Sequence, residues 1–348
     1  MTVMKKIFGA TTALVVGTLS AQAGGFERGG NSVAVLFEQG NYAEFSFGSV
    51  APDVSGAIGL GPTGDVAEDY LSFGAAYKRD LSDQLSVALI LDQPWGAHVR
   101  YPAAYGSGFA ELRSSAITLA GRYKATENFS VHAGLRYVTI DGNLRVPTSG
   151  VALQSFDSDA DVGYLVGAAY EIPDIALRVA LTYFSETDHA LPSSLGTIGT
   201  INPPQSVNLD FQTGIAADTL LFGQIRWADW TSTQVNVPPA VAPGSLIDYD
   251  NDVVTYSLGV GRRFNEQWSA AVTFGYEKAQ GGTASTLAPT DGYRSIGIGG
   301  TYTMDNMKIT AGIRYVDVGD ASVTPALPGN EFRDNSAIGF GVKVGYTF

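Results

Sequence analysis

Three arginines occur in closely similar sequence contexts although they lie far apart in the chain. Each follows an aliphatic residue and precedes an aromatic one, in the tripeptides Leu135-Arg136-Tyr137, Ile225-Arg226-Trp227 and Ile313-Arg314-Tyr315. A guanidinium can hold a carboxylate through two parallel hydrogen bonds, which suits a site for an acidic group. The alternative is a set of internal ion pairs with Glu44, Asp210 and Glu277. The pattern therefore predicts either a carboxylate clamp or a ladder of ion pairs.

Four large apolar side chains share the face on which these arginines are expected. They are Leu165, Phe184, Phe222 and Trp230. We expect them to wall a pocket for the apolar part of a ligand. The alternative interpretation is that they only fill a narrow interior.

Residues that could support catalysis or bind a metal are few. The chain has no cysteine and three histidines, His98, His132 and His189. His132 with neighbouring hydroxyls does not make a nucleophile–base–acid arrangement, and no Cys/His cluster has the spacing of a metal site. We therefore expect no enzyme, no metal and no cofactor.

The elements that must position these side chains are strands, because the dominant apolar period is two. In Ser130–Tyr137 the odd positions are apolar and the even ones polar or small, so alternate residues share a face. Fourteen such segments are predicted, most of them as long as the roughly 9–11 residues that cross a bilayer obliquely. They span 41–51, 68–79, 84–92, 111–124, 129–141, 158–171, 175–186, 206–216, 219–231, 250–264, 267–278, 292–304, 307–318 and 336–348.

The connections between these strands alternate strictly between short and long. The tight ones are 80–83, 125–128, 172–174, 217–218, 265–266 and 305–306. The long ones are 52–67, 93–110, 142–157, 187–205, 232–249, 279–291 and 319–335. Short periplasmic turns, long outer loops and an even strand count are typical of outer-membrane barrels. We expect an all-β protein, a 14-stranded antiparallel transmembrane β-barrel over residues 41–348, in the outer membrane with both termini periplasmic.

Composition and the N-terminus agree with an exported membrane barrel. Only 16% of residues are charged, whereas about 25% is usual in soluble proteins. Residues 1–23 have the features of a secretory signal peptide: Lys5 and Lys6, a short apolar core and the cleavage motif Ala21-Gln22-Ala23. Its removal takes the net charge from −13 to −15, which argues against nucleic acid as a partner.

Four segments carry a resemblance to known proteins. The terminal Gly345-Tyr346-Thr347-Phe348 resembles the C-terminal signature of outer-membrane barrels, which implies recognition by the barrel-assembly machinery. Residues 41–56 and 224–230, with 259–264 following, resemble the FadL/TodX family of outer-membrane transporters for long-chain fatty acids and aromatic hydrocarbons. The resemblance covers essentially the whole mature chain and implies a fourteen-stranded barrel.

One departure from that family concerns the N-terminus. Family members start with a longer lumenal plug that contains an Asn-Pro-Ala element, whereas only residues 24–40 precede the first strand here and the element is missing. We expect residues 24–40 to form a reduced plug. The alternative is a short disordered leader.

The long loops contain apolar residues that suggest where a ligand is captured and released. Trp95, Tyr101, Tyr105 and Phe109 are expected to form a capture groove, although packing of the loops against one another would also explain them. The third strand meets Asp92, Pro94 and Gly96. Pro94 has no N–H for a neighbouring strand, and the resemblance implies an inward kink with a lateral opening, expected at the seam with the fourth strand. The alternative is that Pro94 simply begins a loop.

Together these features predict an outer-membrane channel for facilitated diffusion of hydrophobic small molecules, with long-chain fatty acids as the leading ligand class. Outer-membrane lipids are its surroundings. Two alternatives remain open, a general small-solute porin and a structural or adhesive surface barrel. A water-filled lumen is expected of 16–18 strands rather than fourteen.

Overall fold

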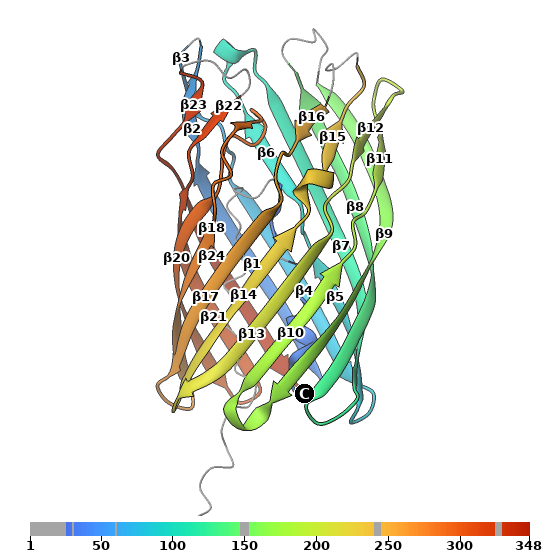
Figure 1. Cartoon of the computed structure of the whole chain (residues 1–348), viewed down its shortest axis with the longest axis vertical. Helices are drawn as coiled ribbons and strands as arrows, with labels where there is room; N and C mark the ends of the chain where they lie inside the picture. The colour runs from blue at the N-terminus through green and yellow to red at the C-terminus, as the bar shows by residue number, and fades with distance from the viewer. Residues whose placement is uncertain (1–25, 30, 60, 147–152, 240–244, 324–328) are drawn as a thin grey trace, which may run out of the picture.

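Fourteen long antiparallel strands close into a barrel in the computed structural model of the chain (Figure 1). The structure describes residues 26–29, 31–59, 61–146, 153–239, 245–323 and 329–348, so the predicted signal peptide lies outside the described residues. The barrel strands are β1 (Tyr42–Asp53), β4 (Tyr70–Asp80), β5 (Leu85–Asp92), β7 (Phe109–Lys124), β8 (Phe129–Arg145), β9 (Gln154–Ile172), β10 (Leu177–Phe184), β13 (Ser206–Ala216), β14 (Thr219–Ala228), β17 (Val253–Arg263), β18 (Trp268–Glu277), β20 (Tyr293–Met304), β21 (Met307–Val318) and β24 (Asn335–Thr347). Pairing of β1 with β24 closes the ring. The predicted fold class and strand number are confirmed.

Strand boundaries differ from the prediction where local turn chemistry intervenes. The strand predicted at 175–186 begins only at Leu177, because Pro173–Ile175 forms the short 3-10 helix η4. The strand predicted at 219–231 ends at Ala228, because Trp230–Ser232 forms the 3-10 helix η5. Alternation alone does not reveal such single turns.

The two faces of the barrel wall have opposite character. Large apolar side chains cover the outer face, where Leu119 is 60% exposed and Leu135 61% exposed. Aromatic pairs lie near the tight turns, such as Trp268 with Tyr302 at 4.8 Å between ring centroids. In lipid every backbone polar group must find an internal partner, and closure of the ladder provides one. Among the described residues, no helix is long and apolar enough to cross a membrane.

The long loops gather at one end of the barrel, and the tight turns and the C-terminus lie at the other (Figure 1). One small sheet contains β11 (His189–Pro192), β12 (Ile198–Ile201), β15 (Gln234–Asn236) and β16 (Ser245–Asp248). A second contains β2 (Ser55–Ile58), β3 (Gly61–Asp65), β19 (Thr283–Ala284), β22 (Ala321–Val323) and β23 (Glu331–Phe332). We call the end of the barrel at which the long loops gather the mouth.

Residues Phe26–Gly29 and 31–40, here called the N-terminal segment, run inside the barrel. The 3-10 helix η1 (Ala34–Phe37) packs its buried Leu36 and Phe37 into one apolar cluster with inward residues of β4, β5, β7, β9 and β10. The guanidinium carbons of Arg122 and Arg178 lie 4.4 and 4.7 Å from the centre of the Phe37 ring. Inward side chains from one continuous arc of the wall, from β4 to β10, therefore hold this segment.

The outward face should behave as a lipid-contacting surface. Replacing Leu119 by Arg is expected to destabilise the barrel by about 2–4 kcal/mol, the cost of a basic side chain near the bilayer midplane. Ser46→Arg is the control, because Ser46 borders an internal polar cavity. Urea unfolding in lipid vesicles measures both. Equal effects of the two substitutions would contradict burial of this face in lipid.

Candidate transport path

The third strand of the barrel is kinked. It runs as β5 to Asp92, breaks at Gln93–Trp95, and resumes as β6 (Gly96–Arg100), while both parts pair with β7. The Trp95 side chain is buried, and its backbone N–H and C=O bond to the Ser114 hydroxyl at 2.8 and 2.7 Å. The predicted lateral-opening residues Asp92, Pro94 and Gly96 therefore all lie at the kink.

The N-terminal segment supplies backbone partners to the kink. The N–H groups of Arg28 and Gly29 donate to the carbonyl of Pro94 at 2.7 and 3.2 Å, and the N–H of Gly96 donates to Phe26 at 2.8 Å. A Cβ atom added at Gly96 would lie 2.6 Å from Nε of Arg28. Glycine at this position thus permits the close approach of the segment.

The kink interrupts the barrel wall between β4 and β6. The β4–β5 ladder ends at the pair Ala75–Leu91, and pairing resumes near the mouth at Ala67–Val99. Between them the Phe73 N–H donates to the side-chain oxygen of Gln93 at 2.9 Å. We call this interval, bordered by 70–74 and 93–97, the wall gap.

The wall gap lies at a different seam from the one expected. The ladder between the third and fourth strands runs without interruption from Leu85–Tyr123 to Asp92–Ala116. The expectation of an opening there was wrong, because the inward turn at Trp95 keeps β6 attached to β7 and separates it from β4.

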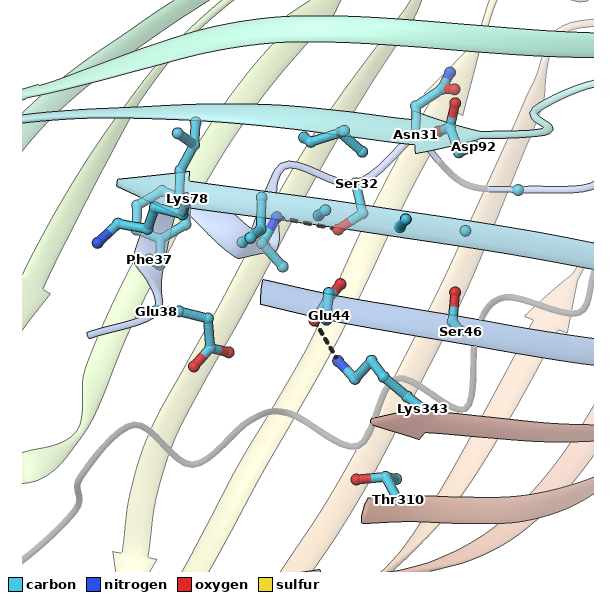
Figure 2. A pocket seen from close by; sticks show the side chains of 18 of the residues that line it. Asn31, Ser32, Phe37, Glu38, Glu44, Ser46, Lys78, Asp92, Thr310 and Lys343 are labelled. Atoms are coloured by element: carbon cyan, nitrogen blue, oxygen red, sulfur yellow. Dashed lines mark hydrogen bonds and ion pairs between the residues drawn. The ribbon is translucent and has the colours of Figure 1, made fainter. Parts of the chain in front are cut away.

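A cavity of about 590 Å³, here called the lower cavity, occupies the lumen beside η1 and reaches the wall gap at Phe73, Gly74 and Gln93. Figure 2 shows Glu38, Glu44 and Lys343 directed into it. The Glu44 carboxylate forms an ion pair with the Lys343 ammonium group, with 3.3 Å between Oε2 and Nζ. Burial raises the pKa of Glu38, against the effect of Lys308 and Lys343. Much of the cavity is thus polar and charged.

A second cavity at the mouth, of about 90 Å³, is mainly apolar, and we call it the mouth pocket. It is surrounded by residues of β6, β7 and β8, by the small sheet of β11, β12, β15 and β16, and by the adjoining loops. Its lining includes Phe26, Leu144, Phe156, Ile201, Ile247 and Tyr249. Its one charged lining residue among those that the structure describes is the acidic Glu111.

Three aromatic rings lie between the mouth pocket and the deeper lumen. Phe26, Trp95 and Trp230 contact one another edge to face, with ring centroids 5.1–6.0 Å apart. All three side chains are almost fully buried. Because Phe26 belongs to the N-terminal segment, this aromatic barrier depends on the position of that segment.

All three predicted arginines point inward and are buried, and two of them are occupied by carboxylates. Arg226 donates a hydrogen bond from Nε to Oε2 of Glu27 at 3.2 Å and one from Nη1 to Oδ1 of Asn208 at 2.8 Å. Its Nη2 lies 2.8 Å from Oε1 of Glu27 in an ion pair. Burial raises the pKa of Glu27, and the facing Arg226 opposes that shift. Arg136 pairs with Asp92 at 3.3 Å. In the alternative interpretation of internal ion pairs, the partners Glu44, Asp210 and Glu277 were wrong, because the acids that pair with Arg136 and Arg226 lie at the kink and on the N-terminal segment.

Arg314 differs from the other two arginines. In the part of the chain that the structure describes, no carboxylate lies within ion-pair distance, and its Nε has no hydrogen-bond partner. It is the next inward residue above Gly312, which lines the lower cavity.

The other residues predicted to bind ligand do not lie together in one site. Leu165 and Phe184 pack with η1, Phe222 packs against a separate cluster around Val50, and Trp230 belongs to the aromatic barrier. Of the predicted groove, Trp95 lies in the barrier, and Tyr101 and Tyr105 bond to loop carbonyls of Thr286 and Ile58. Phe109 stacks on Arg100 at 4.6 Å. None of these four lines the mouth pocket.

Sequence reasoning missed Phe26, Glu27, Phe156 and Tyr249. The first two precede the strands, and the others carry no motif. His132 bonds to Thr182 at 2.8 Å inside the lumen. No cluster of acidic and histidine side chains among the described residues could hold a metal ion.

The architecture defines a fourteen-stranded barrel with an internal segment and a kinked third strand. No family model and no curated protein matches the sequence. Solved structures do match. A Pseudomonas aeruginosa FadL homologue has a TM-score of 0.72 at 14% identity over 94% of this chain and 96% of that one. The Pseudomonas putida toluene transporter TodX gives 0.67 at 15% over 93% and 96%. The Ralstonia pickettii toluene transporter TbuX gives 0.63 at 14% over 89% and 90%.

These likenesses show that the chain has the fold of the FadL/TodX-type barrels, as its sequence motifs predicted. The names of the matched proteins describe transporters and a FadL homologue rather than enzymes.

Breaking the Glu27–Arg226 pair should release the N-terminal segment. Arg226→Met leaves a buried carboxylate without its partner, and loss of one member of a buried pair costs about 3–5 kcal/mol. We expect higher ion conductance through the barrel in planar bilayers. The double variant Glu27→Gln, Arg226→Met also lacks the pair but buries no unpaired carboxylate, so its conductance should lie between those of the single variant and the wild type. Unchanged conductance in the single variant would show that the pair does not hold the segment.

Proposed function

We propose that this protein is an outer-membrane channel that admits small hydrophobic compounds, chiefly neutral ones, and releases them sideways into the membrane. The wall gap carries the proposal. A channel for polar solutes has no use for an opening toward lipid, whereas an apolar molecule gains free energy by leaving water for hydrocarbon.

The proposed path has four parts. A ligand binds in the mouth pocket, passes the aromatic barrier, reaches the upper part of the lower cavity and leaves through the wall gap. The charged groups Glu38, Glu44 and Lys343 line the lower cavity. An apolar molecule that moved further down would displace water from these groups, which costs free energy. The N-terminal segment acts in this scheme as a short plug that sets the position of Phe26.

We also propose the cellular setting that such a path requires. The predicted signal peptide exports the chain, the barrel-assembly machinery reads the C-terminal strand, and both termini face the periplasm. The mouth then faces outward, among the outer-membrane lipids. The general porin is a weaker candidate, because η1 and its neighbours fill part of the lumen. An adhesive barrel has no need of two internal cavities.

Closing the wall gap should block uptake. The chain has no cysteine, so Ser72→Cys with Gln93→Cys can be joined across the gap by a short bifunctional maleimide. Uptake of radiolabelled toluene by cells producing this variant should fall to the level of cells without the channel. The control joins Leu89→Cys to Leu119→Cys across the paired β5–β7 seam, and should transport normally. Undiminished uptake with the gap closed would overturn lateral release.

Long-chain fatty acids are a second ligand class, and Arg314 is the observation that favours them. A buried guanidinium without an acidic partner is costly and offers two parallel donors to a carboxylate. The tail would then lie in the lower cavity, along its apolar border at Val35 and Ile90.

Arg314→Met should separate the two classes. We expect it to weaken the binding of palmitate about tenfold, the loss of a charge-assisted hydrogen bond, while methyl palmitate is unaffected. Arg136→Met is the comparison, because Asp92 already occupies that arginine. Calorimetric titration in detergent measures both. Equal affinity of the wild type for acid and ester would remove the carboxylate role of Arg314.

A further inference from the structure

We propose that the Arg28 side chain is the gate of the wall gap, and that its contact with the ring of Tyr70 holds this gate closed. The inference rests on the proposed lateral release and names the residue that controls it. It assigns a role to a charged side chain that the proposed path does not otherwise use.

The Arg28 side chain reaches from one edge of the wall gap to the other. Its backbone N–H donates to the Pro94 carbonyl at 2.7 Å, which joins it to the kinked strand. Its stem crosses over Gly96, where an added Cβ atom would lie 2.6 Å from Nε and 2.7 Å from Cδ and Cζ. Its guanidinium carbon lies 4.1 Å from the centre of the Tyr70 ring on β4. One residue therefore spans the gap from β6 to β4.

The faces of the two strands place this side chain in the opening itself. Gly96 pairs with Arg113 of β7, whose side chain is 57% exposed on the outer face of the barrel, and directly paired residues share a face. The Arg28 stem therefore covers the outward face of β6. Tyr70 alternates with the exposed Leu71 and is buried on the inward face of β4. Because β6 has turned inward, the space between these two faces is the throat of the wall gap.

The guanidinium of Arg28 has no acidic partner. Among the described residues no carboxylate lies within ion-pair distance of it, and its Nε has no hydrogen-bond partner. The side chain is half-buried and lines the lower cavity. A cation that has left water without a counter-ion is attracted by the face of an aromatic ring, and more strongly than an exposed cation. The ring of Tyr70 therefore orients the guanidinium.

Arg100 provides a contrast at the other end of β6. Its guanidinium carbon lies 4.6 Å from the centre of the Phe109 ring, but Phe109 belongs to β7, the strand with which β6 pairs. Arg100 is exposed, and its ion pair with Glu68 lies where backbone hydrogen bonds already join residues 66–68 to β6. The contact made by Arg28 crosses the wall gap, whereas the similar contact made by Arg100 does not.

Closure by one side chain allows the exit to open without a large rearrangement. At the periplasmic side of the gap, the Gln93 side chain already bridges to the Phe73 N–H. A compound in the lower cavity has to move the guanidinium away from Tyr70 before it enters the lipid. The backbone bond of Arg28 to Pro94 keeps the N-terminal segment in place while its side chain moves.

Access from the lipid to the throat tests the gate, because the chain has no cysteine. Ser72→Cys places one thiol on β4 at the lining of the lower cavity, where a maleimide attached to a lipid acyl chain reaches it through the wall gap. In vesicles, Arg28→Met and Tyr70→Leu should each raise the labelling rate about threefold to thirtyfold, the effect of losing a desolvated cation–π contact. Both substitutions together should raise it no further, because each alone already removes the shared contact.

Three comparisons separate this contact from other effects. Tyr70→Phe keeps the ring face and should keep the slow labelling, which shows that the hydroxyl is not responsible. Arg100→Met removes the similar contact on β7 and should also leave the labelling slow. Leu119→Cys, on the lipid-contacting face, reports the reactivity of the maleimide and should label rapidly in every background.

Each outcome decides the gate separately from the proposed function. Unchanged labelling in Arg28→Met and Tyr70→Leu, or a double variant in which the two effects multiply, overturns the gate while lateral release stands. A conductance of Arg28→Met as high as that of Arg226→Met would mean that the whole N-terminal segment has moved, which also overturns the gate. If the thiol introduced at position 72 is labelled from the lipid in no variant, the wall gap is not open to lipid and the proposed function fails as well.

Discussion

Satisfaction of backbone hydrogen bonds is the constraint on which the rest of this structure depends. A barrel in lipid can leave no edge open, yet here one strand turns inward at Trp95 and loses its neighbour on one side. The Ser114 hydroxyl and the backbone of Phe26–Gly29 take over as partners of the displaced groups. The N-terminal segment thereby provides hydrogen bonds that a neighbouring strand would otherwise form with the kinked strand.

The lumenal charges follow from the same arrangement. Arg226 holds Glu27 of the segment, and Arg136 holds Asp92 at the start of the kink. Both ion pairs fix elements that lack the regular strand-to-strand hydrogen bonds of the barrel. Two arginines that resemble ligand-binding residues by their sequence context thus maintain the geometry around the aromatic barrier, and Arg314 is left as the candidate for an acidic group.

The sequence predicted the barrel well because lipid on one side and a lumen on the other impose a period of two on every strand. Strand number, inward parity of Arg136, Arg226 and Arg314, and the break at Pro94 all follow from that pattern. Partners distant in sequence could not be predicted, since Glu27 and Arg226 are 199 residues apart. The seam of the wall gap depended on which neighbour β6 keeps, and one strand's sequence does not determine that. The mouth pocket combines residues from many loops, so no spacing identifies Phe156 or Tyr249.

The position of Phe26 has a consequence for permeability. Its ring contacts Trp95 and Trp230 in the barrier and lines the mouth pocket, while its carbonyl accepts the N–H of Gly96 beside the wall gap. One residue thus touches both ends of the route. A compound that displaces the ring to pass inward also disturbs the backbone that borders the exit. Under the proposed function, the side opening responds to the compound that passes while η1 keeps part of the lumen filled, so that water-soluble molecules gain no open path.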